Sequence, residues 1–249
     1  MKGWLARFRR KTAKPPPPAR LLHVAPATGG TPIAVALKRS PRARRLVLSV
    51  DPGLAQPRLV IPPFVSIGEA QAFLDSRAAW LVRRLRALPP RAALGDGAAI
   101  PFLGGVLTLR HAPEARGIAR RGDVLHVAGD PRHLSRRAVD WLKRAAREEF
   151  AVMAAAKAAE AGRPRPRVMI RDPKRQWGSC SADGVLRLSW RLVLAPRWVA
   201  EYVIAHEVAH LIEMNHGRAF WAAVRGLTPR MDEARLWLKR NGNALLRFG

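Results

Sequence analysis

The pattern best suited to chemistry lies near the C-terminus, where His206-Glu207-Val208-Ala209-His210 has H-E-x-x-H spacing. Residues four apart in a helix lie on one face, about one turn apart, so both imidazoles can reach one zinc ion. Glu207 follows the first histidine and can reach a water activated by the metal, as a general base. The pattern predicts a metal-dependent hydrolytic site.

A third histidine, His216, follows His210 by six residues, just past a predicted helix end at 215–217. A bend there can return its imidazole to the metal, and three protein ligands plus water make a catalytic zinc site. Three of the chain's seven histidines fall between 206 and 216. This clustering disfavours the interpretation that they are unrelated core or surface histidines. Glu213 shares the helix face, but it lies nearly two turns from His206. We expect it to support the ligands or form a salt bridge.

Residues further upstream are candidates for the surroundings of this site. Cys180 is the only cysteine, which excludes an intramolecular disulfide and a multi-cysteine zinc site. It lies in the W-G-S-C-S stretch, and its possible roles are a nucleophile, a fourth metal ligand or a packed thiol. We expect this stretch to be a structural loop that braces the site. Trp177 is interpreted as core or cleft wall. Arg175 and Arg191 are candidate donors to a developing oxyanion.

The N-terminal half is rich in predicted strands. Alternating apolar residues over 33–62, separated by turn residues, predict a β meander. Ser66 and Glu69 form a capping-box pattern that opens a helix, which Pro89-Pro90 ends. Two more strands are expected at 100–109 and 124–127, with a polar stretch at 111–123 between them as a soft boundary.

The C-terminal half is mainly helical. Ser135 is the predicted N-cap of a long helix over 136–161, and a strand over 185–194 leads to the helix that begins at Pro196 and carries His206. Whether that strand is the sheet edge that pairs with a substrate is left open. A short helix at 217–224 and a last helix closed by Asn241-Gly242 complete the chain.

The chain's 45 basic and 18 acidic residues give a formal charge of +27, concentrated near the start. Residues 1–50 hold twelve basic residues and no acidic one. This excess is either a by-product of an arginine-rich composition or a surface for nucleic acid or anionic membrane. The sequence contains no run of about 18 apolar residues, so we expect no membrane span. The basic start is not followed by the apolar centre of a signal peptide. We therefore expect a cytoplasmic protein without an integral membrane segment.

Four separate motifs follow one another in the C-terminal half: W-G-S-C-S at 177–181, S-W-R-L-V-L-A-P at 189–196, H-E-V-A-H at 206–210 and N-H-G-R-A-F-W at 215–221. In order and spacing they resemble the YgjP-like metallopeptidase domain, a zincin family related to SprT-like and WLM-type peptidases. The resemblance implies His206, His210 and His216 as metal ligands and Glu207 as catalytic base. One departure is Gln176, where the family usually has arginine before W-G-S-C.

These observations predict an α+β, zincin-like metallopeptidase with an N-terminal β-rich part and a C-terminal helical part. We expect a basic, proline-rich disordered tail over 1–20, a β-rich part over 21–130 and a catalytic part over 131–249. The expected activity is hydrolysis of peptide bonds in a protein or peptide substrate, with one Zn²⁺ per chain. Two alternatives stay open. One is a nucleic-acid-associated protein acting through its basic N-terminal region, including a protease of DNA-bound proteins; the other is a non-catalytic scaffold stabilised by zinc.

Overall fold

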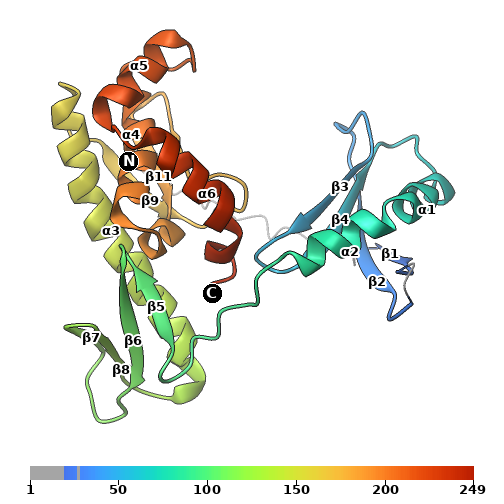
Figure 1. The fold of residues 1–249 in the computed structure, drawn as a ribbon, viewed down its shortest axis with the longest axis horizontal. Coiled ribbons are helices and arrows are strands. Elements are labelled where there is room, and N and C mark those ends of the chain that lie inside the picture. Colours follow the sequence, from blue (N-terminus) through green and yellow to red (C-terminus); the bar gives the residue numbers. More distant parts are fainter. Residues whose placement is uncertain (1–19, 27–28) are drawn as a thin grey trace, which may run out of the picture. The chain divides into compact units, whose positions relative to one another are not determined.

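The computed structural model describes residues 20–26 and 29–249, and it divides into two compact units (Figure 1). One unit comprises the described residues up to Asp51 together with Gln56–Leu85, and the other comprises Pro52–Ala55 and Arg86–Gly249. The predicted tail lies outside the described residues, apart from Arg20. The boundary between the units falls near residue 86 instead of 130, because the strands between 99 and 127 pack into the same core as the C-terminal helices.

The first unit is a four-stranded sheet covered by two helices. Its strands are β1 (Arg20–Val24), β2 (Ile33–Arg39), β3 (Val47–Asp51) and β4 (Gln56–Ile61). Their order is β1-β2-β4-β3, with β2 and β4 parallel and the other pairs antiparallel. The alternating residues were therefore predicted correctly as strands, but the simple meander was wrong. Pairing order depends on contacts between residues far apart in the chain, which alternation does not encode.

The helices of this unit are α1 (Ile67–Ser76) and α2 (Ala78–Arg86). The predicted capping box is present: the Glu69 amide donates to the Ser66 hydroxyl at 3.2 Å, and Glu69 Oε2 accepts from the Ser66 amide at 2.8 Å. A single helix was expected, but the chain breaks at Arg77, which has φ −108° and ψ 6°. Leu74 and Leu81, one on each helix, are fully buried in this unit's own core.

The second unit begins with another four-stranded sheet, of order β5-β6-β8-β7. Its strands are β5 (Ala99–Phe102), β6 (Gly105–His111), β7 (Ile118–Arg121) and β8 (Val124–Val127). The predicted strand at 124–127 is present as β8, whereas the single strand expected over 100–109 is an antiparallel hairpin, β5 and β6, that turns at Leu103 and Gly104. The polar stretch at 111–123 contributes β7. A short 3₁₀ turn, η1 (Pro131–His133), leads into the long helix α3 (Leu134–Glu160). This helix starts before Ser135, so Ser135 is not its N-cap.

A three-stranded sheet precedes the C-terminal helices. It contains β9 (Arg167–Arg171), β10 (Gly178–Cys180) and β11 (Val185–Ser189) in the order β10-β11-β9. The predicted strand over 185–194 ends at Ser189, and the next five residues form a 3₁₀ turn, η2 (Trp190–Leu194). All five of these side chains are buried, including Arg191. The apolar residues in this segment are therefore explained by a buried 3₁₀ turn and not by one buried face of a strand.

Three helices complete the unit: α4 (Arg197–Ala209), α5 (Arg218–Leu227) and α6 (Met231–Leu245). Helix α4 is capped by Pro196 and packs against α3, α5, α6 and β10, so it is buried almost all round (Figure 1). Helix α6 passes through Gly242, where its end was predicted, and continues to Leu245. None of the helices in the described part of the chain is long and apolar enough to cross a membrane.

Candidate metal centre

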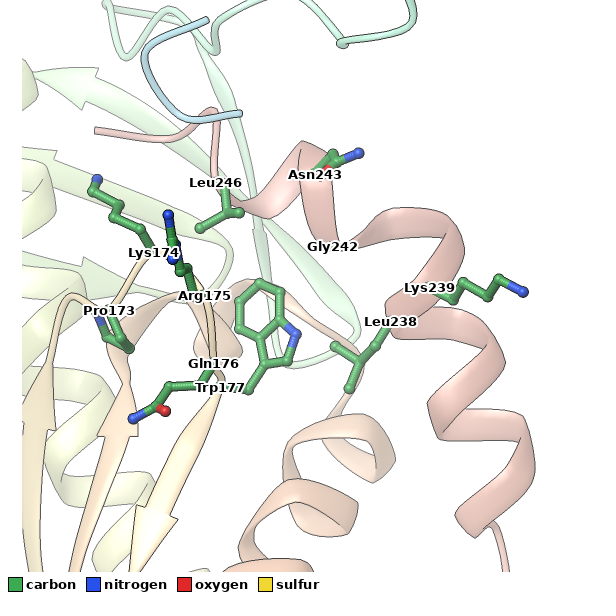
Figure 2. Close-up of a pocket in the computed structure, with 10 residues that line it drawn as sticks. All are labelled: Pro173, Lys174, Arg175, Gln176, Trp177, Leu238, Lys239, Gly242, Asn243 and Leu246. Atoms are coloured by element: carbon green, nitrogen blue, oxygen red, sulfur yellow. The ribbon is translucent and has the colours of Figure 1, made fainter. Parts of the chain in front are cut away.

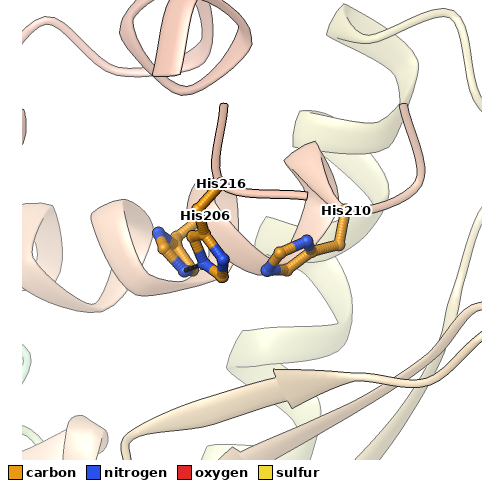
Figure 3. A group of neighbouring side chains, drawn as sticks. All are labelled: His206, His210 and His216. Carbon is orange, nitrogen blue, oxygen red and sulfur yellow. Dashed lines mark hydrogen bonds between the residues drawn. The ribbon is translucent and has the colours of Figure 1, made fainter. Parts of the chain in front are cut away.

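The three predicted ligands converge at the C-terminal end of α4. His206 lies in its last turn, His210 is its C-cap residue, and His216 comes from the loop before α5. One ring nitrogen from each lies within 4.8 Å of the others (Figure 3). The Nε2 atoms of His206 and His216 are 3.3 Å apart. Two nitrogens bound to one zinc ion at about 2.0–2.1 Å, at a tetrahedral angle, would also be roughly 3.3 Å apart. The donor set therefore fits zinc.

Hydrogen bonding separates these histidines from ordinary core histidines. Nδ1 of His210 lies 3.2 Å from the main-chain oxygen of Glu213, so an N–H there donates to the carbonyl and leaves Nε2 as the free lone pair. Nδ1 of His206 is buried and has no hydrogen-bond partner in the described part of the chain. Buried polar groups usually have partners. These side chains are therefore placed for something other than a network among themselves.

The surroundings keep the imidazoles of His206 and His210 neutral. Burial, followed by the neighbouring His210 and His216, lowers the pKa of His206 to about 4. Burial also lowers the pKa of His210. Neutral imidazole is the form that binds metal ions. The buried ring of Phe220, on α5, packs 4.5 Å from the rings of both His210 and His216.

Glu207 lies against the main chain of β10. Its side chain is only 5% exposed, and burial raises the pKa of the carboxyl to about 7. A Cβ atom on Gly178 would be 2.5 Å from Oε1 of Glu207 and 2.7 Å from its Cγ. Such distances are too short for any side chain, so only glycine leaves room for this carboxylate. The contact with Glu207 thus explains on steric grounds why the W-G-S-C-S stretch has glycine at position 178.

A cavity of about 380 Å³ opens over His206 and Glu207. It lies between β10 and the loop before it, α4 and α6. The residues that line it are Gln176, Trp177, Gly178, Tyr202, Val203, His206, Glu207, Arg235 and Leu238. Arg235, from α6, was missed in the sequence, because no motif connects it with a site formed about thirty residues earlier. Its guanidinium lies 5.5 Å from the ring of Trp221 and pairs with Asp232 at 3.5 Å.

The model of the YgjP-like metallopeptidase domain matches residues 44–241. The chain belongs to this family. The family and the arrangement of strands and helices confirm the predicted α+β, zincin-like fold, and the protein is a metallopeptidase.

Two solved structures are similar to part of this metallopeptidase. The zymogen of Pyrococcus abyssi abylysin is 26% identical, with a TM-score of 0.34, over 36% of this chain and 93% of that one. The zymogen of Methanocaldococcus jannaschii jannalysin is 21% identical, with a TM-score of 0.33, over 36% and 94%. No curated protein matches the chain.

Other residues singled out in the sequence occupy different places in the metallopeptidase. Trp177, interpreted in the sequence as core or cleft wall, lines the cavity. Glu213 contacts the cluster through its main-chain oxygen, while its carboxylate accepts from the Asn215 amide at 3.0 Å. Arg191 is 2% exposed and bonds to Asp172 and to the carbonyl of Phe248, so its guanidinium holds the C-terminus and does not line the cavity.

Arg175 lines a neighbouring cavity and not the one over the histidines. Cys180 ends β10 and is half-buried, with its thiol 3.5 Å from the carbonyl of Ser181. Burial, followed by the charge of Glu207, raises the pKa of this thiol. Among the described residues the ligand cluster is formed by histidines, without the cysteine. These positions fit the structural interpretation of the W-G-S-C-S loop.

Proposed function

We propose that the protein is a zinc-dependent peptidase in which His206, His210 and His216 hold one zinc ion per chain. The observation that carries the proposal is the convergence of three imidazoles beside a buried carboxylate, with His206 and Glu207 lining one cavity. Imidazole nitrogen suits zinc, and three protein ligands leave a position open for catalysis. The family match describes a peptidase and gives no support to the nucleic-acid alternative.

When bound, zinc supplies a water of lowered pKa and polarises the carbonyl of the scissile bond. Glu207 is the proposed general base: its carboxylate takes a proton from the attacking water as the new C–O bond forms. It then gives that proton to the nitrogen of the leaving amine as the C–N bond breaks. The main chain at Gly178 packs closely against this carboxylate and limits where it can lie.

The substrate chain is proposed to lie along β10. Strand β11 is central in its sheet, so the edge beside Glu207 is β10, within the described residues. Ser179 pairs with Arg187 of β11, and hydrogen-bonding direction alternates along an antiparallel pair. The main-chain groups of Gly178 and Cys180 therefore point away from β11. An extended peptide can add to this edge by main-chain pairing, which favours unfolded substrates.

The test compares the wild type with Glu207→Gln on an unfolded protein substrate. Glutamine has the same shape as glutamate and still fits against Gly178, so the variant should fold and bind zinc normally. We expect hydrolysis to fall by roughly 10²–10⁴-fold, the usual contribution of a general base. If Glu207→Gln hydrolyses the substrate as fast as the wild type, Glu207 is not the base. If the zinc-loaded wild type hydrolyses nothing, the peptidase proposal fails.

A further inference from the structure

A second cavity adjoins the candidate active site on the other side of Trp177 (Figure 2). It encloses about 170 Å³ between the loop over 173–177 and helix α6. Both cavities are lined by Gln176, Trp177 and Leu238, so they share a wall. Sites for whole drug-sized ligands measure roughly 300–1,000 Å³. The smaller volume therefore suits a single side chain of a longer substrate.

The rim of this second cavity is positively charged. Lys174, Arg175 and Lys239 line it, and no acidic residue does. The carboxylate of Asp172 lies 4.0 Å from Lys174, but it also accepts from the buried guanidinium of Arg191. Within the part of the chain that the structure describes, Arg175 has no carboxylate within 4.0 Å. An anionic group entering the cavity would thus find cationic groups that internal pairs do not neutralise.

The charged groups are not evenly placed around the cavity. In Figure 2 the side chain of Arg175 extends from the loop on the side of Leu246, and that of Lys174 extends outward next to it, away from Trp177. The ammonium group of Lys239 is also directed away from Trp177, along the outside of α6. Recognition of an anion would therefore depend chiefly on Arg175, with the charge of Lys174 beside it on the same loop.

The floor of the cavity is apolar and firmly held. A Cβ atom on Gly242 would be 3.0 Å from Cζ2 of Trp177, so the indole packs directly on the backbone of α6. Leu238 and Leu246 complete the apolar surface. An apolar floor under a cationic rim matches a glutamate side chain, which has two methylene groups below a carboxylate. Charge-assisted hydrogen bonds to lysine and arginine are the strong ones.

The cavity also lies where a bound peptide would pass. Trp177 immediately precedes β10, and Gly178 contacts Glu207. A peptide extended along β10 advances about 3.3 Å per residue, so a side chain a few residues from the scissile bond reaches the second cavity. We propose that this cavity is a specificity subsite for an acidic side chain of the substrate, glutamate above all. The proposal rests on the peptidase function proposed above.

The experiment uses the full-length, zinc-loaded protein. Cleavage sites in an unfolded protein are first mapped by mass spectrometry. Matched fluorogenic peptides then carry Glu, Gln or Lys at each position near the bond. We expect one position where Glu exceeds Lys about tenfold in kcat/KM, which corresponds to about 1.4 kcal/mol. The double variant Lys174→Glu/Arg175→Glu should reverse this preference. The control Arg240→Glu changes an exposed α6 residue outside the cavity and should not.

A binding measurement keeps the two proposals distinguishable. Fluorescence anisotropy records the affinity of the same peptides for Glu207→Gln, which holds them uncut. If no peptide is hydrolysed by the wild type, the peptidase function fails, yet a Glu-over-Lys preference in binding that the double variant removes still supports the subsite. Equal cleavage and equal binding of the Glu, Gln and Lys peptides at every position would overturn it. So would a preference that Lys174→Glu/Arg175→Glu leaves unchanged.

Discussion

The contact between Gly178 and Glu207 makes a single methyl group a sharp probe of the site. In Gly178→Ala the new Cβ would lie 2.5 Å from Oε1 of Glu207, 2.7 Å from Cγ and 2.9 Å from Cδ. The carboxylate must retreat by roughly 0.9 Å to reach the 3.4 Å of an ordinary contact. Displacing a catalytic group by about 1 Å costs on the order of 10²-fold in rate. We therefore expect kcat/KM to fall about 100-fold, or about 2.7 kcal/mol.

The assay is hydrolysis of an unfolded protein substrate, with zinc content and thermal unfolding measured on the same samples. Overpacking of this kind destabilises a protein by about 1–3 kcal/mol, so Gly178→Ala should still be folded at 25 °C. Zinc content should stay normal, because the methyl group meets the carboxylate and not the imidazoles. The matched control is Gly226→Ala on α5, where an added Cβ meets nothing within 4 Å. It should leave kcat/KM unchanged.

A double-mutant cycle with Glu207→Asp tests the contact itself. Aspartate is one methylene shorter, so it relieves the clash with Ala at position 178 while it moves the base. The two substitutions should therefore be strongly non-additive, because both act on one carboxylate. Full activity and unchanged stability of Gly178→Ala would refute the placement of Glu207 against β10. Simple additivity of the two effects would refute the reasoning that they share a cause.

Three further predictions concern the surroundings of the site. Arg191→Ala removes charge-assisted hydrogen bonds at a buried position, so it should destabilise the protein by about 2–3 kcal/mol and lower Tm by roughly 5–10 °C. Its kcat/KM well below the transition should stay unchanged; a selective loss of kcat would return Arg191 to the catalytic machinery. Iodoacetamide at pH 8 should alkylate Cys180 more slowly in the folded protein than in urea, because the raised pKa of the thiol leaves less thiolate. Cys180→Ser should keep its activity. Labelling of the folded protein as fast as in urea would contradict the placement of this thiol. Removing zinc with a chelator should lower Tm, and re-adding zinc at about 1,000 times its Kd should restore about 4 kcal/mol of stability; an unchanged Tm would show that the folded state does not bind the ion.

The candidate ligands could be predicted from the sequence because their geometry is local. His206 and His210 are brought together by one helical turn, and His216 by a bend six residues later. The capping box at Ser66 was equally readable, since both of its bonds join residues three apart. Patterns of this range depend only on backbone geometry that one element defines.

What the sequence did not reveal depends on partners far apart in the chain. The role of Gly178 follows from Glu207, 29 positions later, and Arg235 joins the cavity from a third element. Arg191 was interpreted as a candidate oxyanion donor, but its partners Asp172 and Phe248, which hold its guanidinium away from the cavity, lie 19 and 57 positions away in the sequence. The sheet order β1-β2-β4-β3 escaped prediction for the same reason.

The zinc content of protein purified without chelator, measured by elemental analysis, tests the proposed metal centre most directly. We expect close to one zinc ion per chain in the wild type. We expect the same in Glu207→Gln, and little zinc in His206→Ala, which loses a ligand from the buried end of the cluster. A folded wild-type protein without zinc, or a His206→Ala variant that binds zinc as fully as the wild type, would contradict the proposed metal centre.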